Sequence, residues 1–382
     1  MSKAVGVFVF LLAGGCIEPI DLSSINYEKK LVVEGLITNE TKQHQIILSR
    51  TNSLNNLRFT PEERAFVSII DSNGVTTPTT EASPGIYKTP YFSGTIGLRY
   101  KLSIVTSNGD EFVSEEVTLM DTPPIEKIYA QYSTHSNAGP GIQIFLDTSD
   151  PQNNTHYYRW EYEGTYEIKT PYPSKFIWTG GNTLTIRTNS VDHCWASDTS
   201  KNVLIRTTQG LLQNKVVAFP LKFIPAESPD LVIKYSILAK QYSLNEKSFF
   251  FWKQLEEINE EQGSLFDKQP GTIAGNIFSV NNNQKSVLGY FDASAVATMR
   301  AFFTPRQFAE SGYIPPLYLQ SCVETAPVTI PIEELGETME AYQKSLIIAD
   351  AGGEGPSVVF LMRIACCDCT SRGTNLKPTF WE

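Results

Sequence analysis

The sequence predicts a mainly β protein, with an amino-terminal immunoglobulin- or fibronectin-like sandwich followed by a larger β-rich domain that contains one or two helices. Three observations predict this fold class. Short apolar or alternating runs recur along the chain between turn residues. The 21 Phe, 17 Tyr and 5 Trp are residue types that strands favour. Helical periodicity is confined to one or two segments. A chain of 382 residues is long enough for two domains.

The composition excludes several classes of protein. A hydrophobic content of 41% supports packed cores and argues against a disordered chain or a coiled coil. The net charge of −10 argues against a nucleic-acid partner, because binding to phosphates needs clustered Lys and Arg. Four His leave little room for a His-rich metal site, and we expect neither a metal nor another cofactor.

Residues 1–15 are predicted to be a lipoprotein signal peptide. Lys3 gives a positive start, and Ala4–Ala13 is an unbroken apolar run of ten residues. A membrane-spanning helix needs about 20 apolar residues, so this run has the length of a secretory signal instead. The small residues of Ala13-Gly14-Gly15-Cys16 resemble a bacterial lipobox, in which the chain is cut before the cysteine.

Residues 16–30 are expected to form a lipidated tether. After cleavage Cys16 would be the first residue and would carry acyl chains such as palmitate, and several chains anchor a protein stably. Glu18 and Asp21 make the start of the tether acidic. The alternative is an ordinary signal peptide that is cut elsewhere and leaves Cys16 as a free thiol.

Residues 31–120 are predicted to form the sandwich domain. Turn sequences such as Ser72-Asn73-Gly74 separate the apolar runs, and Asn-Gly favours the positive φ of tight hairpin turns. Residues 121–125 are the predicted linker, because Pro123 and Pro124 remove two backbone donors. The predicted strands are Leu31–Ile37, Gln45–Ser49, Ala65–Ile70, Gly85–Lys88, Tyr100–Val105 and Glu111–Leu119.

Residues 126–382 are predicted to form the larger β-rich domain. A helix is expected over residues 245–262, with Asn245 as its cap and Gly263 as its stop, and a second over Ile332–Ser345. Phe251, Leu255 and Ile258 recur at helical spacing and should pack on a sheet. The predicted strands are Lys127–Tyr132, Ile142–Leu146, Tyr157–Ile168, Leu184–Arg187, Val203–Thr207, Val216–Phe223, Leu231–Tyr242 and Val358–Ile364.

The cysteines beyond Cys16 predict disulfides, because an exported chain enters an oxidising compartment. Five are present, so one would remain over, and the connectivity cannot be read from the sequence. Half of a metal site and a redox-active C-x-x-C are the alternatives. The candidates are Cys194, Cys322, Cys366, Cys367 and Cys369.

No catalytic residue can be assigned from the sequence, and we expect the protein not to be an enzyme. The Gly-x-Ser-x-Gly and His-Glu-x-x-His motifs are absent from the sequence. Asp147 and Asp150, with Asn153 and Asn154 nearby, could belong to a plain loop, a calcium site or a pair of catalytic carboxylates.

Aromatic residues are the candidate contacts for a ligand or partner. On a strand, Tyr158, Trp160 and Tyr162 would share one face, with Arg159 and Glu161 on the other. If that aromatic face is exposed, it suits sugar rings or a protein partner. The alternative is that another layer covers the face, in which case the three rings belong to a core.

Several segments together resemble the surface lipoproteins of Bacteroidota that carry a domain of unknown function, numbered 4249. The resemblance covers essentially the whole mature chain. The segments that carry it are Cys16–Asp21, Leu31–Ile37, Tyr157–Trp160, Cys194-Trp195, Tyr235-Ser236, Gln241–Leu244, Phe251-Trp252, Gly263–Asp267, Gly275–Ile277, Leu288–Phe291, Cys366–Cys369, Arg372–Thr374, Lys377-Pro378 and Phe380-Trp381.

The resemblance implies an outer-membrane lipoprotein that is often encoded beside a TonB-dependent receptor. We therefore expect a non-catalytic accessory of such a receptor, which captures substrate or caps the barrel and faces the cell surface. The family has no known catalytic residues, so none is carried over. One alternative is a structural or assembly accessory of another outer-membrane complex. The other is a surface protein that binds or cleaves glycans.

Overall fold

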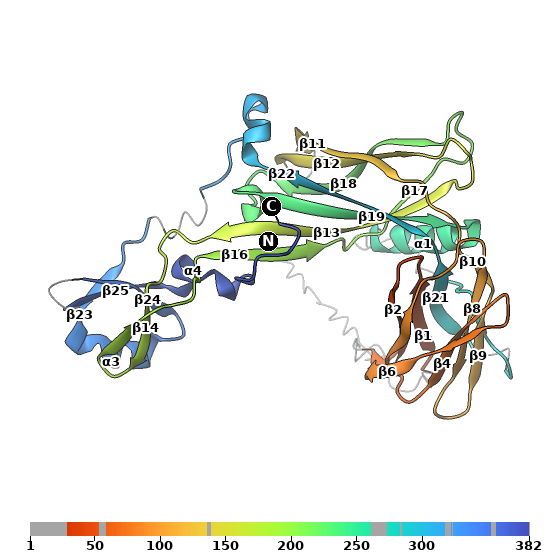
Figure 1. Cartoon of the computed structure of the whole chain (residues 1–382), viewed down its shortest axis with the longest axis horizontal. Helices are drawn as coiled ribbons and strands as arrows, with labels where there is room; N and C mark the ends of the chain where they lie inside the picture. The colour runs from red at the N-terminus through yellow and green to blue at the C-terminus, as the bar shows by residue number, and fades with distance from the viewer. Residues whose placement is uncertain are drawn as a thin grey trace, which may run out of the picture.

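The computed structural model describes residues 29–52, 59–135, 139–260, 273–282, 285–317, 322, 324–352 and 357–381. Cys16, the preceding signal and Gly263 lie outside these residues. The chain is mainly β, as predicted, and three units follow one another along the long axis (Figure 1). Within the described ranges, no helix combines the length and the apolar character that crossing a membrane requires.

The first unit is a sandwich of two sheets. One sheet has the order β21-β1-β2-β7-β6, with β3 pairing with β2, and the other has the order β20-β9-β8-β4-β5, with β10 pairing with β8. The strands are β1 (Leu31–Ile37), β2 (Lys42–Arg50), β3 (Thr60–Pro61), β4 (Phe66–Asp71), β5 (Thr76–Pro78), β6 (Thr80–Ser83), β7 (Ile86–Phe92), β8 (Arg99–Val105), β9 (Glu111–Ser114), β10 (Val117–Thr118), β20 (Ile277–Ser279) and β21 (Val287–Ala293).

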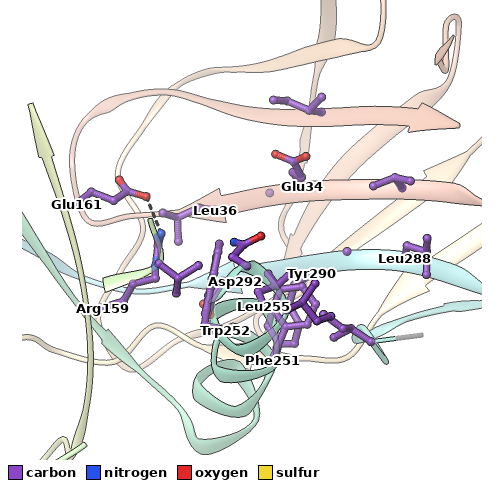
Figure 2. Close-up of a pocket in the computed structure, with 18 of the residues that line it drawn as sticks. Glu34, Leu36, Arg159, Glu161, Phe251, Trp252, Leu255, Leu288, Tyr290 and Asp292 are labelled. Atoms are coloured by element: carbon purple, nitrogen blue, oxygen red, sulfur yellow. Dashed lines mark hydrogen bonds and ion pairs between the residues drawn. The ribbon is translucent and has the colours of Figure 1, made fainter. Parts of the chain in front are cut away.

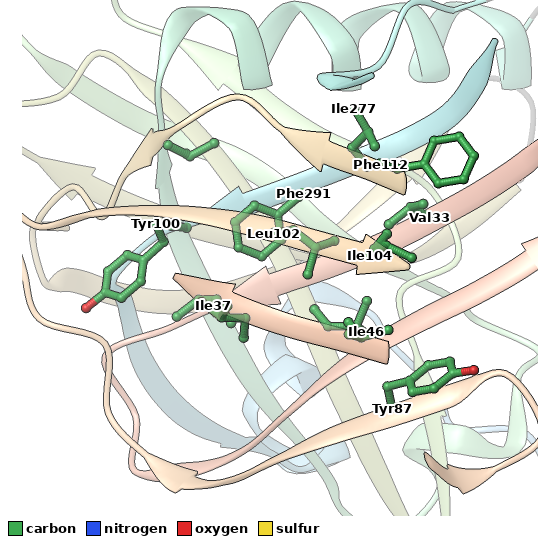
Figure 3. Close-up of a cluster of buried hydrophobic side chains, with 14 of the residues drawn as sticks. Val33, Ile37, Ile46, Tyr87, Tyr100, Leu102, Ile104, Phe112, Ile277 and Phe291 are labelled. Atoms are coloured by element: carbon green, nitrogen blue, oxygen red, sulfur yellow. The ribbon is translucent and has the colours of Figure 1, made fainter. Parts of the chain in front are cut away.

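The core of this sandwich lies between the two sheets (Figure 3). Alternate residues of each strand point inward, so Val33 and Ile37 of β1 meet Leu102 and Ile104 of β8. The predicted strand Leu31–Ile37 is confirmed at both ends. The predicted run Glu111–Leu119 forms two short strands, β9 and β10, instead of one.

Two strands of the sandwich come from far along the chain. The sequence predicts a break after residue 120, yet β21 runs parallel to β1, with Val287 opposite Leu31, and β20 pairs with β9. The Asn276 side chain also donates to the backbone carbonyl of Phe291 and accepts from its amide, at 2.8 and 2.9 Å. This pairing supplies a partner to β1 that residues 31–120 do not provide.

The second unit is a second sandwich, with sheets β11-β12-β18 and β16-β13-β19-β22, in which β17 also pairs with β13. Trp160, Tyr235 and Ile144 lie in its core. The strands are β11 (Ile125–His135), β12 (Gly139–Ser149), β13 (Tyr157–Lys169), β16 (His193–Thr199), β17 (Leu204–Thr207), β18 (Lys215–Pro225), β19 (Tyr235–Leu244) and β22 (Val296–Phe303), with short 3₁₀ helices η2 (Pro229–Leu231) and η3 (Pro305–Ser311).

The helix predicted over residues 245–262 is confirmed as α1 (Glu246–Glu260), between the two sandwiches (Figure 1). The Asn245 side chain accepts the Ser248 amide at 2.9 Å, which is the predicted cap. Phe251 is buried, whereas Leu255 and Ile258 remain half-buried. The apolar stripe of α1 is therefore only partly covered.

The third unit is held by the disulfides. The predicted bonds are confirmed: they join Cys194 to Cys369 and Cys322 to Cys366, and Cys367 is the free, buried thiol among the described cysteines. The predicted helix Ile332–Ser345 is shorter and follows a 3₁₀ turn. The elements are β14 (Phe176–Gly180), β15 (Thr183–Ile186), β23 (Val328–Pro331), β24 (Leu346–Gly352), β25 (Val358–Arg363), η4 (Ile332–Glu334), α3 (Leu335–Tyr342), α4 (Ile364–Cys367) and η5 (Cys369–Ser371).

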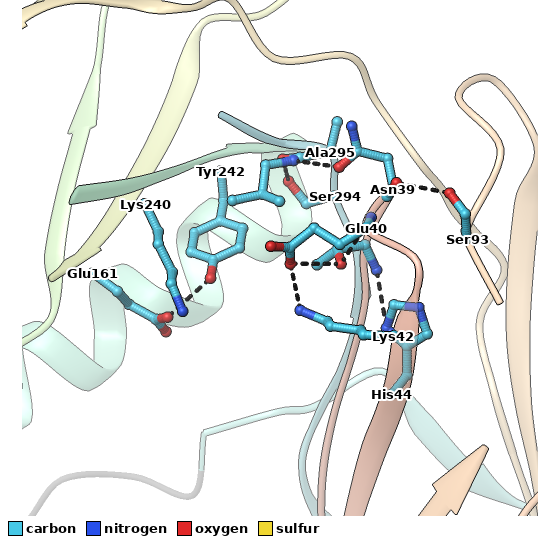
Figure 4. Close-up of polar contacts among 12 residues, drawn as sticks. Asn39, Glu40, Lys42, His44, Ser93, Glu161, Lys240, Tyr242, Ser294 and Ala295 are labelled. Atoms are coloured by element: carbon cyan, nitrogen blue, oxygen red, sulfur yellow. Dashed lines mark hydrogen bonds and ion pairs between the residues drawn. The ribbon is translucent and has the colours of Figure 1, made fainter. Parts of the chain in front are cut away.

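A short connection couples the two sandwiches (Figure 4). Ser294 and Ala295, which join β21 to β22, are both fully buried. The Ser294 hydroxyl donates to the Ser243 carbonyl of β19 at 2.6 Å. The Val296 amide donates to the Asn39 side chain of the first sandwich at 2.9 Å. Since hydrogen bonds hold both ends of this buried connection, the two sandwiches are fixed against each other at this point.

Candidate functional site

The predicted aromatic face of β13 belongs to the core. Tyr158 and Trp160 are fully buried, and Tyr162 is half-buried. The Trp160 ring centroid lies 4.1 Å from that of Phe219, with the two rings tilted, and the indole N–H donates to the Gln241 side chain at 2.8 Å. The alternative of core packing therefore holds for Tyr158 and Trp160, because the sheet β11-β12-β18 covers this face. Neither ring offers a surface to a sugar or a partner.

Replacing Trp160 with alanine should lower the free energy of unfolding by about 3–5 kcal/mol, since the change removes a buried indole and leaves Gln241 without its donor. Denaturant unfolding measures the effect. The exposed Tyr91 is the control, and Tyr91→Ala should change stability little. A Trp160→Ala protein of normal stability that loses binding to a glycan would contradict the core assignment.

Asp147 and Asp150 bind backbone amides, as expected if they belong to a plain loop, the first of the three alternatives given above. Asp150 accepts the amides of Gln152, Asn154 and Thr155 at 2.7–3.1 Å and so caps the turn that leads into β13. Asp147 accepts the Ala218 amide at 2.7 Å and pairs with Lys127. In the part of the chain that the structure describes, no three His, Cys, Asp or Glu side chains are grouped so as to hold a metal ion.

An apolar groove lies where α1 faces the outer side of the first sandwich, with a cavity volume of about 1040 Å³ (Figure 2). One wall is formed by β1, β2 and β21, and the other by α1 and the neighbouring part of the second sandwich. The lining residues are Lys30, Val32, Glu34, Gly35, Leu36, Gln45, Ile47, Arg159, Glu161, Lys201, Val203, Phe251, Trp252, Leu255, Ile258, Asn259, Ile273, Leu288, Gly289, Tyr290 and Asp292.

Part of the apolar wall comes from the outer face of β1, with Ile47 of β2 beside it. Alternation turns Val33 inward and leaves Val32, Glu34 and Leu36 on the outside. The outer face of an antiparallel pair is ordinarily polar, because it meets water. Here Val32, Leu36 and Ile47 line the groove together with residues of α1.

A charged pair, of which Arg159 is buried and Glu161 is partly exposed, closes the inner end of the groove. Arg159 is 7% exposed, and its guanidinium lies over the rings of Tyr242 and Trp252, 4.6 and 4.4 Å from their centroids. It donates to Glu161 at 2.6 Å. Burial alone would raise the pKa of Glu161, but Arg159 and the Tyr242 hydroxyl together hold that pKa below its usual value. Glu161 is therefore charged at neutral pH.

Asp292 is a buried acid at the same end of the groove. Its Oδ1 accepts from the Ser248 hydroxyl at 3.0 Å and from the Ala293 amide at 2.9 Å, which ties β21 to α1. Burial raises the pKa of Asp292, and the nearby Arg159 opposes that rise. Its Oδ2, the Arg159 Nε and the Trp252 Nε1 are also covered from solvent. They therefore offer no exposed atom to a molecule in the groove.

The chemistry of the groove suits binding. Its described lining contains no Ser, Thr, Cys or His that could act as a nucleophile or as a neutral-pH base. Burial raises the pKa of the lining Tyr290 to about 12, so its hydroxyl stays protonated. The groove combines a mainly apolar lining with a few polar side chains, as ligand-binding sites do.

One family model, described as "Domain of unknown function (DUF4249)", matches residues 17–300. The chain belongs to this family. No curated protein matches it. The DUF4249 region contains every element that lines the groove, including β1, β2, β13, α1 and β21, whereas β23, β24 and β25 follow it. The site therefore lies within the part of the chain that defines the family.

Sequence reasoning missed the groove. The apolar stripe of α1 was visible, but it was expected to be covered by a sheet. The available signal was the pair Val32 and Leu36, two apolar residues on the outward side of a strand whose other side is also apolar. Such a strand is covered on both faces or has one face free for a partner.

Proposed function

We propose that this DUF4249 protein is an outer-membrane lipoprotein and a non-catalytic accessory of a TonB-dependent receptor. The observation that carries the proposal is Cys16, placed directly after a ten-residue apolar run and two glycines. Membership of the family fits this proposal, and so does a groove whose lining suits binding rather than reaction. The accessory would capture substrate or cap the barrel, and it would face the cell surface.

Mass spectrometry of the mature protein tests the anchor. The expected amino terminus is an acylated Cys16, and Cys16→Ser should release the protein from the membrane fraction because no acyl chain is attached. Ser23→Ala, in the same tether, is the control and should leave the protein in the membrane. An unmodified amino terminus at another residue would refute lipidation.

Purification from gently solubilised outer membranes tests the partner. We expect a barrel receptor to co-purify with the wild-type protein, and deletion of the protein to impair uptake of one nutrient. Recovery of lipidated protein without any barrel would refute the receptor role. A broad fall in the levels of many membrane proteins would instead indicate an assembly role.

A further inference from the structure

We infer that the groove between α1 and the first sandwich binds an apolar peptide segment of a membrane-embedded protein partner. The inference rests on the proposed lipid anchor, and it adds the site of contact and the chemistry of what is bound. It follows from the walls of the groove, the charges at its rim and the point at which the tether enters the fold.

The walls of the groove are apolar on both sides. Val32, Ile47 and Leu288 belong to the strands of the sandwich side, and Leu255 and Ile258 belong to α1. All five side chains are half-buried, so each retains apolar surface that a partner could cover. A cavity of about 1040 Å³ matches the upper end of the range for bound ligands and is large enough for several residues of a peptide.

The rim of the groove distinguishes a peptide from a lipid. Lys30 and Lys201 contribute positive charge, and Glu34 contributes negative charge. At the inner end the positive Arg159 pairs with the negative Glu161, so the lining is mixed in sign. Asn259 adds an amide that can both donate and accept. An anionic headgroup would meet both carboxylates in the groove. A neutral peptide backbone carries both donors and acceptors and matches the mixed rim.

The tether places the groove near the membrane. Lys30 lines the groove, and its amide is fixed by the Thr51 hydroxyl at 3.0 Å. Residues 17–29 can span at most about 45 Å when fully extended, so a lipidated Cys16 keeps the rim within that distance of the bilayer surface. A protein embedded in the same membrane can present a segment there at high effective concentration.

Site-specific photo-cross-linking of the full chain in its own membranes tests the inference. A photoreactive phenylalanine analogue is placed at Ile47 on one wall, at Leu255 on the other, and at the exposed Gln254 of the same helix as the matched control. We expect both wall positions to join one segment of the same integral membrane protein. The control position should give at least about tenfold less of that product.

A charge in the groove should abolish the contact. Leu255→Asp is expected to lower cross-linking from Ile47 at least about tenfold, whereas Gln254→Asp, with the same new charge outside the groove, should leave it unchanged. If Leu255→Asp does not fold, Leu288→Gln with the cross-linker at Leu255 makes the same test from the other wall. Circular dichroism shows which variants are folded.

The amino terminus of each sample is analysed by mass spectrometry at the same time. Lipidated Cys16 without a protein adduct from either wall overturns the peptide site and leaves the proposed anchor standing. Adducts to lipid alone, or equal adducts from Gln254, also overturn it. An unlipidated Cys16 overturns the proposed function and, with it, the inference drawn here.

Discussion

Replacing Gly289 with alanine is expected to destabilise the first sandwich by about 3–5 kcal/mol. Gly289 lies in β21 with a φ of +92°, a conformation that residues with a side chain rarely adopt. A Cβ at this position would also overlap the backbone carbonyl of Val33 in β1. Backbone cannot move aside as a flexible side chain can, so the parallel pairing of β21 with β1 should be lost.

A second glycine strengthens this expectation. A Cβ on Gly275 would overlap the carbonyl oxygen of Gly289 itself, so three backbone segments approach one another within a single stack. Both glycines belong to the segments that carry the family resemblance, and the stack gives a physical reason for glycine at each. Asn276 then fixes the stack through both backbone groups of Phe291.

Gly97→Ala is the matched control for Gly289→Ala. Gly97 has a similar φ of +87°, in the same sandwich, but a Cβ there would meet no atom within 4 Å. Gly97→Ala should therefore lower the free energy of unfolding by only about 1–2 kcal/mol, which is the cost of the left-handed backbone conformation. Hydrogen exchange of β1 amides and the free energy of unfolding measure both variants. If both variants lose the same free energy of unfolding, then the close approach of the backbone at Gly289 contributes nothing to the loss.

Local signals predict local structure in this chain. The alternation in Leu31–Ile37 and the Asn245 cap of α1 both depend on neighbours in the sequence. The bounds of this strand and the start of this helix are therefore predicted correctly. The pairing of β21 with β1 joins residues more than two hundred positions apart. No local pattern encodes such a partner, so the predicted sandwich of residues 31–120 lacks the two strands, β20 and β21, that return to it from later in the chain.

The candidate site could be predicted only in part for the same reason. Alternation correctly places Trp160 on one face of β13 and Arg159 on the other. Which face is covered depends on where the sheet β11-β12-β18 packs, and that is a property of the assembled fold. Arg159 and Glu161, on the opposite face, are the residues of β13 that border the groove.

Loss of the disulfide between Cys194 and Cys369 is expected to be the other large effect. This bond joins β16 of the second sandwich to the carboxy-terminal unit across 175 residues of sequence. In the chain-entropy model, a loop of that size contributes about 5 kcal/mol, and the 44-residue separation of Cys322 and Cys366 contributes about 4. The Cys194→Ser, Cys369→Ser variant should therefore lose at least as much free energy of unfolding as the variant in which Cys322 and Cys366 are both replaced by serine.

The free Cys367 supplies the control for this comparison. Burial raises the pKa of the Cys367 thiol to about 12, so it has almost no thiolate at neutral pH and should not attack the neighbouring bonds. Cys367→Ala should accordingly leave both disulfides in place and cost about 1 kcal/mol through the lost packing of a small side chain. Calorimetric unfolding, with and without reductant, measures all three variants. If reductant lowers the unfolding temperature of the wild type no more than that of the Cys194→Ser, Cys369→Ser protein, then this bond does not hold the carboxy-terminal unit to the second sandwich.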